Sequence, residues 1–315
     1  MIQYLKNKPL IINTDLDGLI SGLILKKFLN CHVVGFSTST EKFWVIEQFI
    51  NKLKNVCFVD MYVADQNTFS VDQHIISVNE EHHKLLSQNS KKINPNLMNN
   101  KYFLPNSSYY TKYPFGTIHF IIALLENIGI DLTSLNLKKN IENISFIDLI
   151  LRSDDAMRTT IASEYIQNAK NWWEWLKKMS KNGPITLSFI EYLSQIDSLY
   201  VTNKRDQITR LLKGNPFYCD SSDGGINDIL EGTKIKDSTK EYFQFIAEIS
   251  GIDLFDINFN YKTFKGLAKR TSLSLQQKKE LISNNSINGK KIFSYAFVRS
   301  SNRENNFSYT LINEW

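Results

Sequence analysis

Two acidic residues, Asp15 and Asp17, stand between an apolar run at 9–13 and an apolar segment at 18–30. If the first run is a strand, acids two apart project to the same side, because side chains alternate along a strand. Two such carboxylates repel each other unless a metal ion, a helix N-terminus or an arginine lies between them. The pair predicts a site for a cation or a phosphate, and the N-cap region of a helix is the simpler alternative.

Further polar residues of the same kind follow later in the sequence. Asp60 ends the apolar run 55–60, and Asp72, Gln73 and His74 end the run 69–74. Hard divalent ions such as Mg²⁺ and Mn²⁺ bind oxygen ligands, and manganese also accepts imidazole. These residue types therefore favour a divalent-metal site.

The segments around these residues predict the fold that must bring them together. Residues 9–13, 31–37 and 55–60 are predicted as buried strands, while 18–30 and 40–53 have apolar residues at helical spacing. Alternating strands and helices predict an α/β fold, with a parallel sheet flanked by helices. Ligands of such sheets collect at the carboxyl ends of the strands, and the acidic residues above fall at those ends.

The rest of the chain predicts mostly helices and a final hairpin. Residues 85–112 are polar and predict a long loop, and 114–129 predict a helix opened by Pro114. Residues 139–181 have a mostly helical pattern, and two alternating runs within 290–312 predict a hairpin.

A break at Asn182-Gly183-Pro184 suggests a boundary between two domains. We expect a metal-binding catalytic domain over residues 1–182 and a smaller C-terminal α+β domain, which binds substrate, over 183–315.

The composition is ordinary for a soluble globular protein: 315 residues, 42% hydrophobic and 22% charged. No apolar run approaches the about 20 residues of a membrane helix, and the first residues do not form a signal peptide. Three cysteines without CxxC spacing argue against a zinc ribbon or a disulfide scaffold and favour a reducing cytoplasm. The net charge of +5 is compatible with a phosphate-bearing partner.

In order and spacing, these residues resemble the DHH phosphoesterase superfamily, which includes single-strand-specific exonucleases, oligoribonucleases, cyclic-dinucleotide phosphodiesterases and manganese pyrophosphatases. The resemblance covers roughly residues 9 to 160. Its motifs are similar, in order, to Asp15-Leu16-Asp17-Gly18-Leu19-Ile20-Ser21, to Asp60, to Asp72-Gln73-His74 and to the helix-opening pair Gly116-Thr117. For the acid of the fourth motif, Asp148, Asp154 and Asp155 are alternatives, and the last two follow Arg152 closely.

The resemblance implies roles for these residues. Two Mn²⁺ or Mg²⁺ ions would be held by Asp15, Asp17, Asp60, Asp72, His74 and Asp154, with Asp60 and His74 also catalytic. The substrate would be contacted by Ser21, Gln73, Thr117 and Arg152.

The implied activity is hydrolysis of phosphodiester bonds in single-stranded nucleic acid or short oligonucleotides by a protein with no membrane partner. Two alternatives stay open: a small-molecule phosphohydrolase that cleaves a cyclic dinucleotide or a phosphoanhydride, and a non-catalytic subunit that binds nucleotide or nucleic acid. A homo-oligomer or a protein complex is compatible with each.

Three positions depart from the family pattern. Ile11 stands where a ligand histidine is common, and Gln73 replaces the first histidine of the name-giving triplet. The glycine cluster within 220–228 lacks the histidine of the common Gly-Gly-Gly-His substrate motif. An amide is a poorer manganese ligand than imidazole, so we expect the second ion to bind weakly until substrate oxygens complete its shell.

Other conspicuous residues have structural interpretations. His82 and His83 follow two glutamates and predict a solvated helix face, whereas His119 in an apolar helix predicts a packed core histidine. The three tryptophans within 172–175 predict a core stripe rather than a platform for stacking bases. The basic segment 265–270 is either a solvated face or a contact for a substrate backbone.

Overall fold

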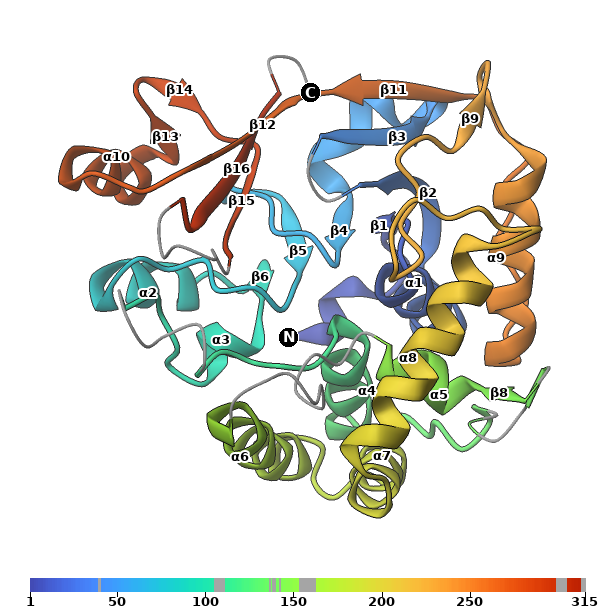
Figure 1. Cartoon of the computed structure of the whole chain (residues 1–315). Coiled ribbons are helices and arrows are strands. Elements are labelled where there is room, and N and C mark those ends of the chain that lie inside the picture. Colours follow the sequence, from blue (N-terminus) through green and yellow to red (C-terminus); the bar gives the residue numbers. More distant parts are fainter. Residues whose placement is uncertain are drawn as a thin grey trace.

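The computed structural model describes residues 1–38, 41–104, 111–135, 137, 140–141, 143–152, 163–298 and 305–312. At its centre is a seven-stranded sheet of order β11-β3-β2-β1-β4-β5-β6 (Figure 1). Its parallel strands are β1 (Pro9–Asn13), β2 (His32–Ser37), β4 (Cys57–Val59), β5 (Phe69–Val71) and β6 (Lys92–Ile93). The predicted α/β class, with a mostly parallel sheet flanked by helices, is confirmed.

The other two strands complete one edge of this sheet. β3 (Lys42–Ile46) is antiparallel to β2, and β11 (Tyr261–Lys265) is antiparallel to β3. The prediction of a helix over 40–53 is therefore wrong: β3 is followed by the 3₁₀ helix η2 (Glu47–Asn55). Phe43, Trp44 and Val45 are all buried, so the strand is covered on both faces. An apolar run of this kind cannot be distinguished from a helix by its period alone.

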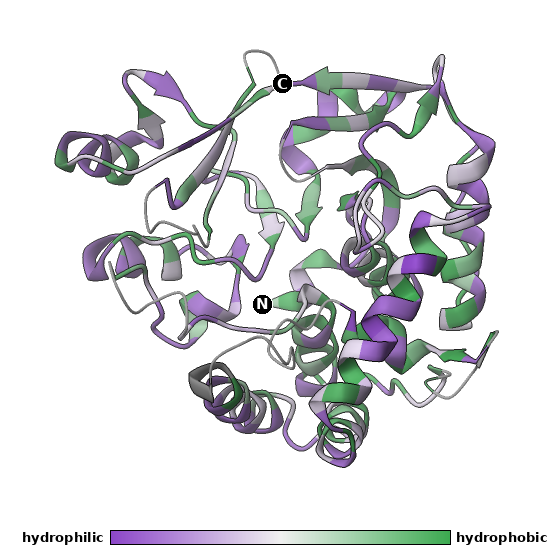
Figure 2. Ribbon diagram, in the orientation of Figure 1, coloured by the Kyte–Doolittle hydropathy of each residue, from purple (hydrophilic) through white to green (hydrophobic). Residues whose placement is uncertain are grey.

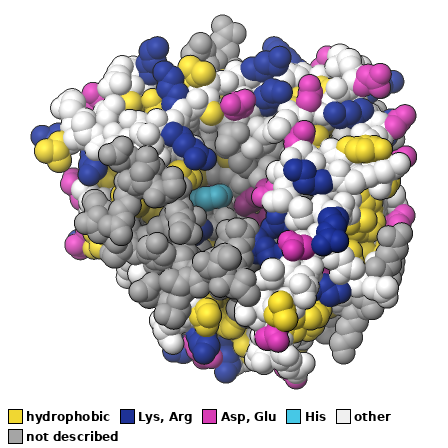
Figure 3. Space-filling view, in the orientation of Figure 1, with side chains coloured by type: hydrophobic (Ala, Val, Ile, Leu, Met, Phe, Trp, Pro, Cys, Tyr) yellow, Lys and Arg dark blue, Asp and Glu magenta, His cyan; other side chains and the backbone are white. Residues whose placement is uncertain are grey.

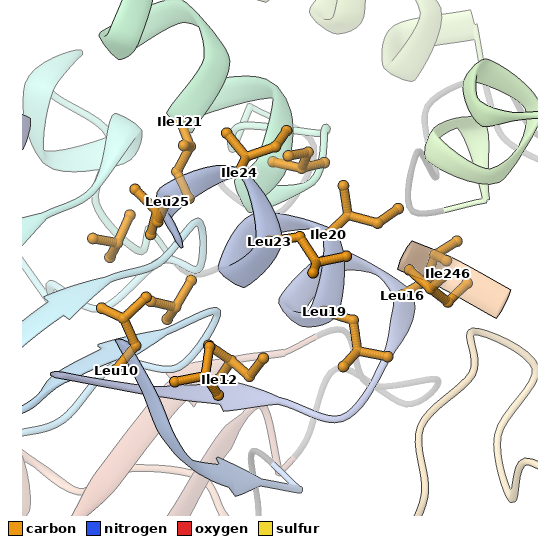
Figure 4. Packing of buried hydrophobic residues seen from close by; sticks show 14 of the residues in the cluster. Leu10, Ile12, Leu16, Leu19, Ile20, Leu23, Ile24, Leu25, Ile121 and Ile246 are labelled. Carbon is orange, nitrogen blue, oxygen red and sulfur yellow. The ribbon is translucent and has the colours of Figure 1, made fainter. Parts of the chain in front are cut away.

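Helix α1 (Leu16–Leu29) connects β1 to β2 and forms the centre of the core. It contacts β1 and the helices α4 (Thr117–Asn127), α5 (Phe146–Leu151) and α9 (Asp237–Ser250). Its leucines and isoleucines are buried in every direction, as expected for a helix that is apolar all round. Figure 4 shows this packing between β1 and α4, and Figure 2 shows the hydrophobic residues concentrated around the same strands and helices.

The opposite face of the sheet is covered by aromatic side chains from the C-terminal part of the chain. Phe43 stacks on Phe264 of β11 and on Phe293, with ring centroids 4.6 and 5.4 Å apart. Beyond Phe293, a three-stranded antiparallel sheet is formed by β12 (Leu267–Thr271), β16 (Phe307–Leu311) and β15 (Ser294–Phe297). The hairpin predicted within 290–312 is therefore confirmed in its two strands.

The smaller elements and the remaining helices connect these layers. They are η1 (Ile2–Leu5), α2 (Glu80–Ser87), α3 (Pro95–Met98), β7 (Asn140–Ile141), β8 (Ile144–Ser145), α6 (Ser163–Met179), α7 (Pro184–Gln195), α8 (Ser198–Lys213), β9 (Leu230–Glu231), β10 (Lys234–Ile235), α10 (Leu275–Asn284), β13 (Ser286–Ile287) and β14 (Lys290–Lys291). The predicted loop 85–112 thus contains β6 and α3, and a small hairpin, β7–β8, precedes α5 within 139–181. Among the described residues, no helix combines the length and the apolarity that crossing a membrane requires.

Residues after 183 contribute to both sheets. β11 completes the edge of the main sheet, whereas β12, β15 and β16 build the smaller one. Side chains from α7, α8 and α9 belong to the same apolar cluster as those of β1 and α1. The division at 182/183 stays a prediction.

Three histidines are buried. His82 and His83 are 2% and 4% exposed, so the predicted solvated face of α2 is wrong at these positions; Glu80, Glu81 and Lys84 form that face instead. Burial lowers the pKa of His82 to about 4. His119 is the packed core histidine that was predicted.

Gly18 in the first turn of α1 allows the helix to approach β1 closely. A Cβ atom at this position would lie 2.4 Å from the backbone oxygen of Asn13. A Cβ at Gly22, one turn later, would lie 2.8 Å from the end of the Ile12 side chain, which can move.

We expect Gly18→Ala to lower the free energy of unfolding by about 1–3 kcal/mol, because backbone atoms must shift to accept the methyl group. Gly22→Ala serves as the matched control and should cost less. Urea unfolding of the two variants measures this difference. Equal losses would contradict the close approach of Gly18 to the Asn13 backbone.

Candidate active site

The predicted acidic residues meet at the carboxyl edge of the main sheet. Asp15 and Asp17 follow β1, Asp60 follows β4, and all three line a cavity of about 440 Å³. The alternation argument assumed that the two N-terminal acids lie on a strand, but neither does. Asp15 is the N-cap of α1, where its Oδ1 accepts a hydrogen bond of 3.0 Å from the Gly18 N–H, and Asp17 lies in the first helical turn. Asp15 therefore caps α1 and also lines the cavity that the acids share.

An amide group connects Asp15 to Asp60. Asn13 Nδ2 donates to Asp15 Oδ2 at 2.7 Å and to Asp60 Oδ2 at 3.1 Å. The amide oxygen of Asn13 accepts a bond of 2.9 Å from the Thr14 N–H, which fixes the orientation of the side chain. One neutral group thus holds carboxylates from two strand ends within a few ångströms of each other.

The N-terminus of α4 holds the other carboxylate oxygens. The N–H groups of Thr117 and Ile118 donate to Asp17 Oδ2 and Oδ1 at 2.7 and 2.8 Å. The Thr117 hydroxyl donates to Asp60 Oδ1 at 2.7 Å. A helix N-terminus carries a partial positive charge, so this arrangement stabilises the ionised form of Asp17. Thr117 is itself fully buried and positions the acids rather than lining the cavity.

His74 enters the cavity from the end of β5. Its Nδ1 lies 2.6 Å from Asp72 Oδ1, and Asp72 Oδ2 accepts from the His74 N–H and from Asn94 Nδ2, both at 3.1 Å. Burial alone would lower the pKa of His74, but the charge and the hydrogen bond of Asp72, together with the charge of Asp60, outweigh burial and raise it. Asp72 is only 1% exposed and does not line the cavity. It therefore acts on the site through His74.

The cavity concentrates negative charge. Burial raises the pKa of Asp15 and of Asp17, and repulsion from Asp60 raises both further. Burial also raises the pKa of Asp60, although the attraction of His74 opposes this. Asp60 adopts a φ of +60°, an uncommon backbone conformation for a residue other than glycine and one that clusters at functional sites. Such a group of acids favours a cation in the cavity.

A loop that sequence reasoning did not assign to the site forms part of the cavity wall. Ser221, Ser222, Asp223 and Gly225 line the cavity, and Asp223 further raises the pKa of Asp15. The loop is attached to the turn after β1: the Ile226 N–H donates to Thr14 Oγ1 at 3.1 Å. The neighbouring Leu16 N–H donates to the Asp223 carbonyl at 2.9 Å. The Ser-Ser-Asp-Gly-Gly run within 220–228 is the sequence feature by which this loop could have been assigned to the site.

The other predicted substrate contacts divide into two groups. Arg152 and Gln73 line the cavity, and Arg152 Nε donates to the Ser222 carbonyl at 2.7 Å. Lys112, which was not predicted, lines it as well. Ser21 lies inside α1, fully buried, and is not part of the cavity wall.

Of the three alternatives for the fourth acid, one is described. Asp148 lies outside the cavity and accepts hydrogen bonds from Tyr192, Tyr200 and Ser145 at 2.7, 2.9 and 2.9 Å, so it joins α5 to α7 and α8. Asp154 and Asp155 lie outside the described residues.

The types of side chain around the cavity suit a divalent cation, but they supply only part of its coordination shell. Among the residues that the structure describes, no three acidic, histidine or cysteine side chains form a group that could hold a metal ion. Gln73 adds a different kind of ligand: its Oε1 is buried, has no hydrogen-bond partner among the described residues and belongs to a residue of the cavity wall. Carboxylate and amide oxygens with one imidazole suit Mg²⁺ or Mn²⁺. Water or substrate oxygens would have to complete the coordination.

Comparison of the chain with models of known families, with curated proteins and with solved structures finds no match. The resemblance to the DHH superfamily therefore depends on the sequence motifs, and the function has to be argued from this site.

His119 lies in the first turn of α4, the helix whose N-terminus binds Asp17. It is 4% exposed, packs against Phe115 and Phe189, and accepts a bond of 3.2 Å from the Gly116 N–H. Burial lowers its pKa from 6.5 to about 4. Between these values the unfolded chain binds a proton that the folded protein does not. The stability contributed by neutral His119 is therefore complete above pH 6.5 and is lost as the pH falls toward 4.

We expect His119→Gln to reduce the loss of unfolding free energy between about pH 7.5 and about pH 5 by about 2 kcal/mol. Glutamine can accept the same backbone bond at this helix position but does not titrate. Urea unfolding at the two pH values measures the change. His32→Gln, the same substitution at an exposed position, provides the control. An unchanged slope for His119→Gln would contradict a neutral buried ring.

Proposed function

We propose that the chain is a divalent-metal-dependent phosphoesterase that hydrolyses phosphodiester bonds of single-stranded nucleic acid or short oligonucleotides. The observation that carries this proposal is the joint placement of Asp15, Asp17 and Asp60. They come from the ends of two parallel strands, share the donors of Asn13 and Thr117, and face a cavity that His74 and Arg152 also line.

In this proposal, the residues of the chain have the following roles. Asn13 and Thr117 orient the carboxylates, and Asp15, Asp60 and Gln73 offer oxygens to a cation. When bound, such a cation activates water and neutralises charge on phosphoryl oxygens. Because Asp72 holds Nδ1, His74 is left with Nε2 for the cavity, where it can bind the cation or a phosphoryl oxygen.

Arg152 and Lys112 supply the positive charge of the cavity wall. The contact of Arg152 with Ser222 fixes its guanidinium against the 220–228 loop, in the wall of the cavity that His74 also lines. A guanidinium can bind two oxygens of one phosphate, which would orient a substrate before reaction. A phosphodiester bound in this cavity would lie among acids, imidazole and guanidinium.

Two observations favour the alternatives. The cavity of about 440 Å³ has the size of a small-molecule site, which suits a cyclic dinucleotide or a phosphoanhydride. The absence of a formed group of three metal-binding side chains among the described residues, together with Gln73, suits a subunit that binds nucleotide without cleaving it.

Asp60→Asn tests the proposal directly. We expect Mn²⁺-dependent hydrolysis of oligonucleotides to fall by about two orders of magnitude or more, because the amide keeps the shape but removes the charge that a bridging position needs. Product analysis measures the rate, and circular dichroism checks that the fold is retained. Asp253→Asn, at an exposed position outside the cavity, is the matched control and should react as the wild type.

Normal hydrolysis by Asp60→Asn would rule out a bridging role for this carboxylate. Binding of oligonucleotide by the wild type without any product would instead support the non-catalytic alternative. Cleavage of a cyclic dinucleotide alone would support the small-molecule enzyme.

Gln73→His tests the incomplete shell. We expect this variant to bind Mn²⁺ about tenfold more tightly without substrate, since imidazole is a better ligand than an amide and changes near a metal shift affinity by about this factor or more. Calorimetric titration measures the affinity and the stoichiometry. Gln276→His places the same ring on the exposed surface of α10 as a control. Equal binding by the wild type and Gln73→His would mean that position 73 does not face the cation.

A further inference from the structure

A second hollow lies at the edge of the main sheet formed by β3 and β11. It measures about 1350 Å³ and is bounded by residues 50–55 of η2, by 262–267 and by β14. Six of the residues lining it are lysines, and none of the described lining residues is acidic: Lys52, Lys54, Lys262, Lys265, Lys290 and Lys291. We call this hollow the lysine groove.

The charges of the lysine groove are available to a partner. All six side chains are exposed, and none forms an ion pair with another described residue. Lys262 lies over the Phe264 ring, and Lys291 donates to the Asn284 carbonyl, so their other contacts are with neutral groups. Lysines gathered around one hollow repel each other and attract anions to it.

The lysine groove leads toward the cavity lined by Asp15, Asp17 and Asp60, which we call the carboxylate cavity. Leu267, at the start of β12, lines the groove, and β12 is the edge strand of its sheet. Three residues further along, or about 10 Å at the rise of a strand, Arg270 lines a small cavity together with Asp60 and His74. Figure 3 shows Lys and Arg side chains in dark blue near the rim of the hollow where a histidine is visible in cyan.

We infer that the lysine groove binds a stretch of single-stranded nucleic acid that continues along β12 into the carboxylate cavity. Six lysines, in a groove with no described acidic residue among those lining it, complement a chain of phosphates, and such contacts bind without sequence preference. The exposed apolar side chain of Leu267 offers a surface for a base at the exit of the groove. The inference rests on the proposed function for the fate of the strand, and it makes the substrate a polynucleotide rather than a dinucleotide.

Binding without metal separates the groove from catalysis. We would measure fluorescence anisotropy of labelled single strands of two and of about 16 nucleotides in EDTA, in the Asp60→Asn background. The groove variant carries Lys262→Gln, Lys265→Gln, Lys290→Gln and Lys291→Gln. The control variant carries four substitutions of exposed lysines elsewhere: Lys170→Gln, Lys178→Gln, Lys213→Gln and Lys234→Gln.

We expect the longer strand to bind the groove variant about tenfold or more weakly, with the salt dependence reduced by up to about 3 units of slope. The control variant has the same loss of charge and should bind as its parent. Equal binding by both variants, or equal weakening in both, would overturn the inference while leaving the hydrolysis assays unaffected. Weakening in the groove variant alone would support it even if no oligonucleotide is cleaved, in which case the proposed function fails and the binding site stands.

Two further probes exclude other anions. Anionic phospholipid vesicles and polyglutamate should bind the groove variant and the control variant equally. A loss of vesicle or polyglutamate binding in the groove variant, with unchanged binding of the single strand, would assign the lysine groove to a membrane or to an acidic protein instead.

Discussion

The site depends on the contact between the N-termini of two helices. Asp17 belongs to the first turn of α1, and its carboxylate accepts both of the first N–H groups of α4. Burying several carboxylates together would be costly without an opposite charge nearby. The positive end of α4 supplies part of that charge and fixes α4 relative to the strand ends, so the acids can lie inside the protein.

Neutral donors then set the distances between the acids. Asn13 spans Asp15 and Asp60, and Thr117 spans Asp60 and, through its backbone, Asp17. None of these contacts removes negative charge from the cavity. The positions of the acids are therefore fixed, while their negative charge is not balanced. Such a site suits the binding of a cation, or of a substrate that carries a cation.

The parts of this site that the sequence predicts are those governed by local rules. The strands and helices from 9 to 37 and the strand before Asp60 follow from short apolar periods, and the meeting of the acids follows from the parallel sheet. β3 could not be predicted because its burial on both faces removes the period. The 220–228 loop joins Thr14 by contacts more than 200 residues apart in sequence, and no local pattern encodes such a pairing.

The place of β11 has a consequence for how the chain folds. β3 lies between β2, which is close in sequence, and β11, which is more than 200 residues further on. During synthesis, the buried side chains of β3 would remain next to an open strand edge until residues 261–265 have left the ribosome. Contacts of such long range slow folding, and an open apolar edge pairs readily with other chains. A nascent chain of this protein is therefore exposed to aggregation at this edge from the synthesis of β3 until β11 follows, more than 200 residues later.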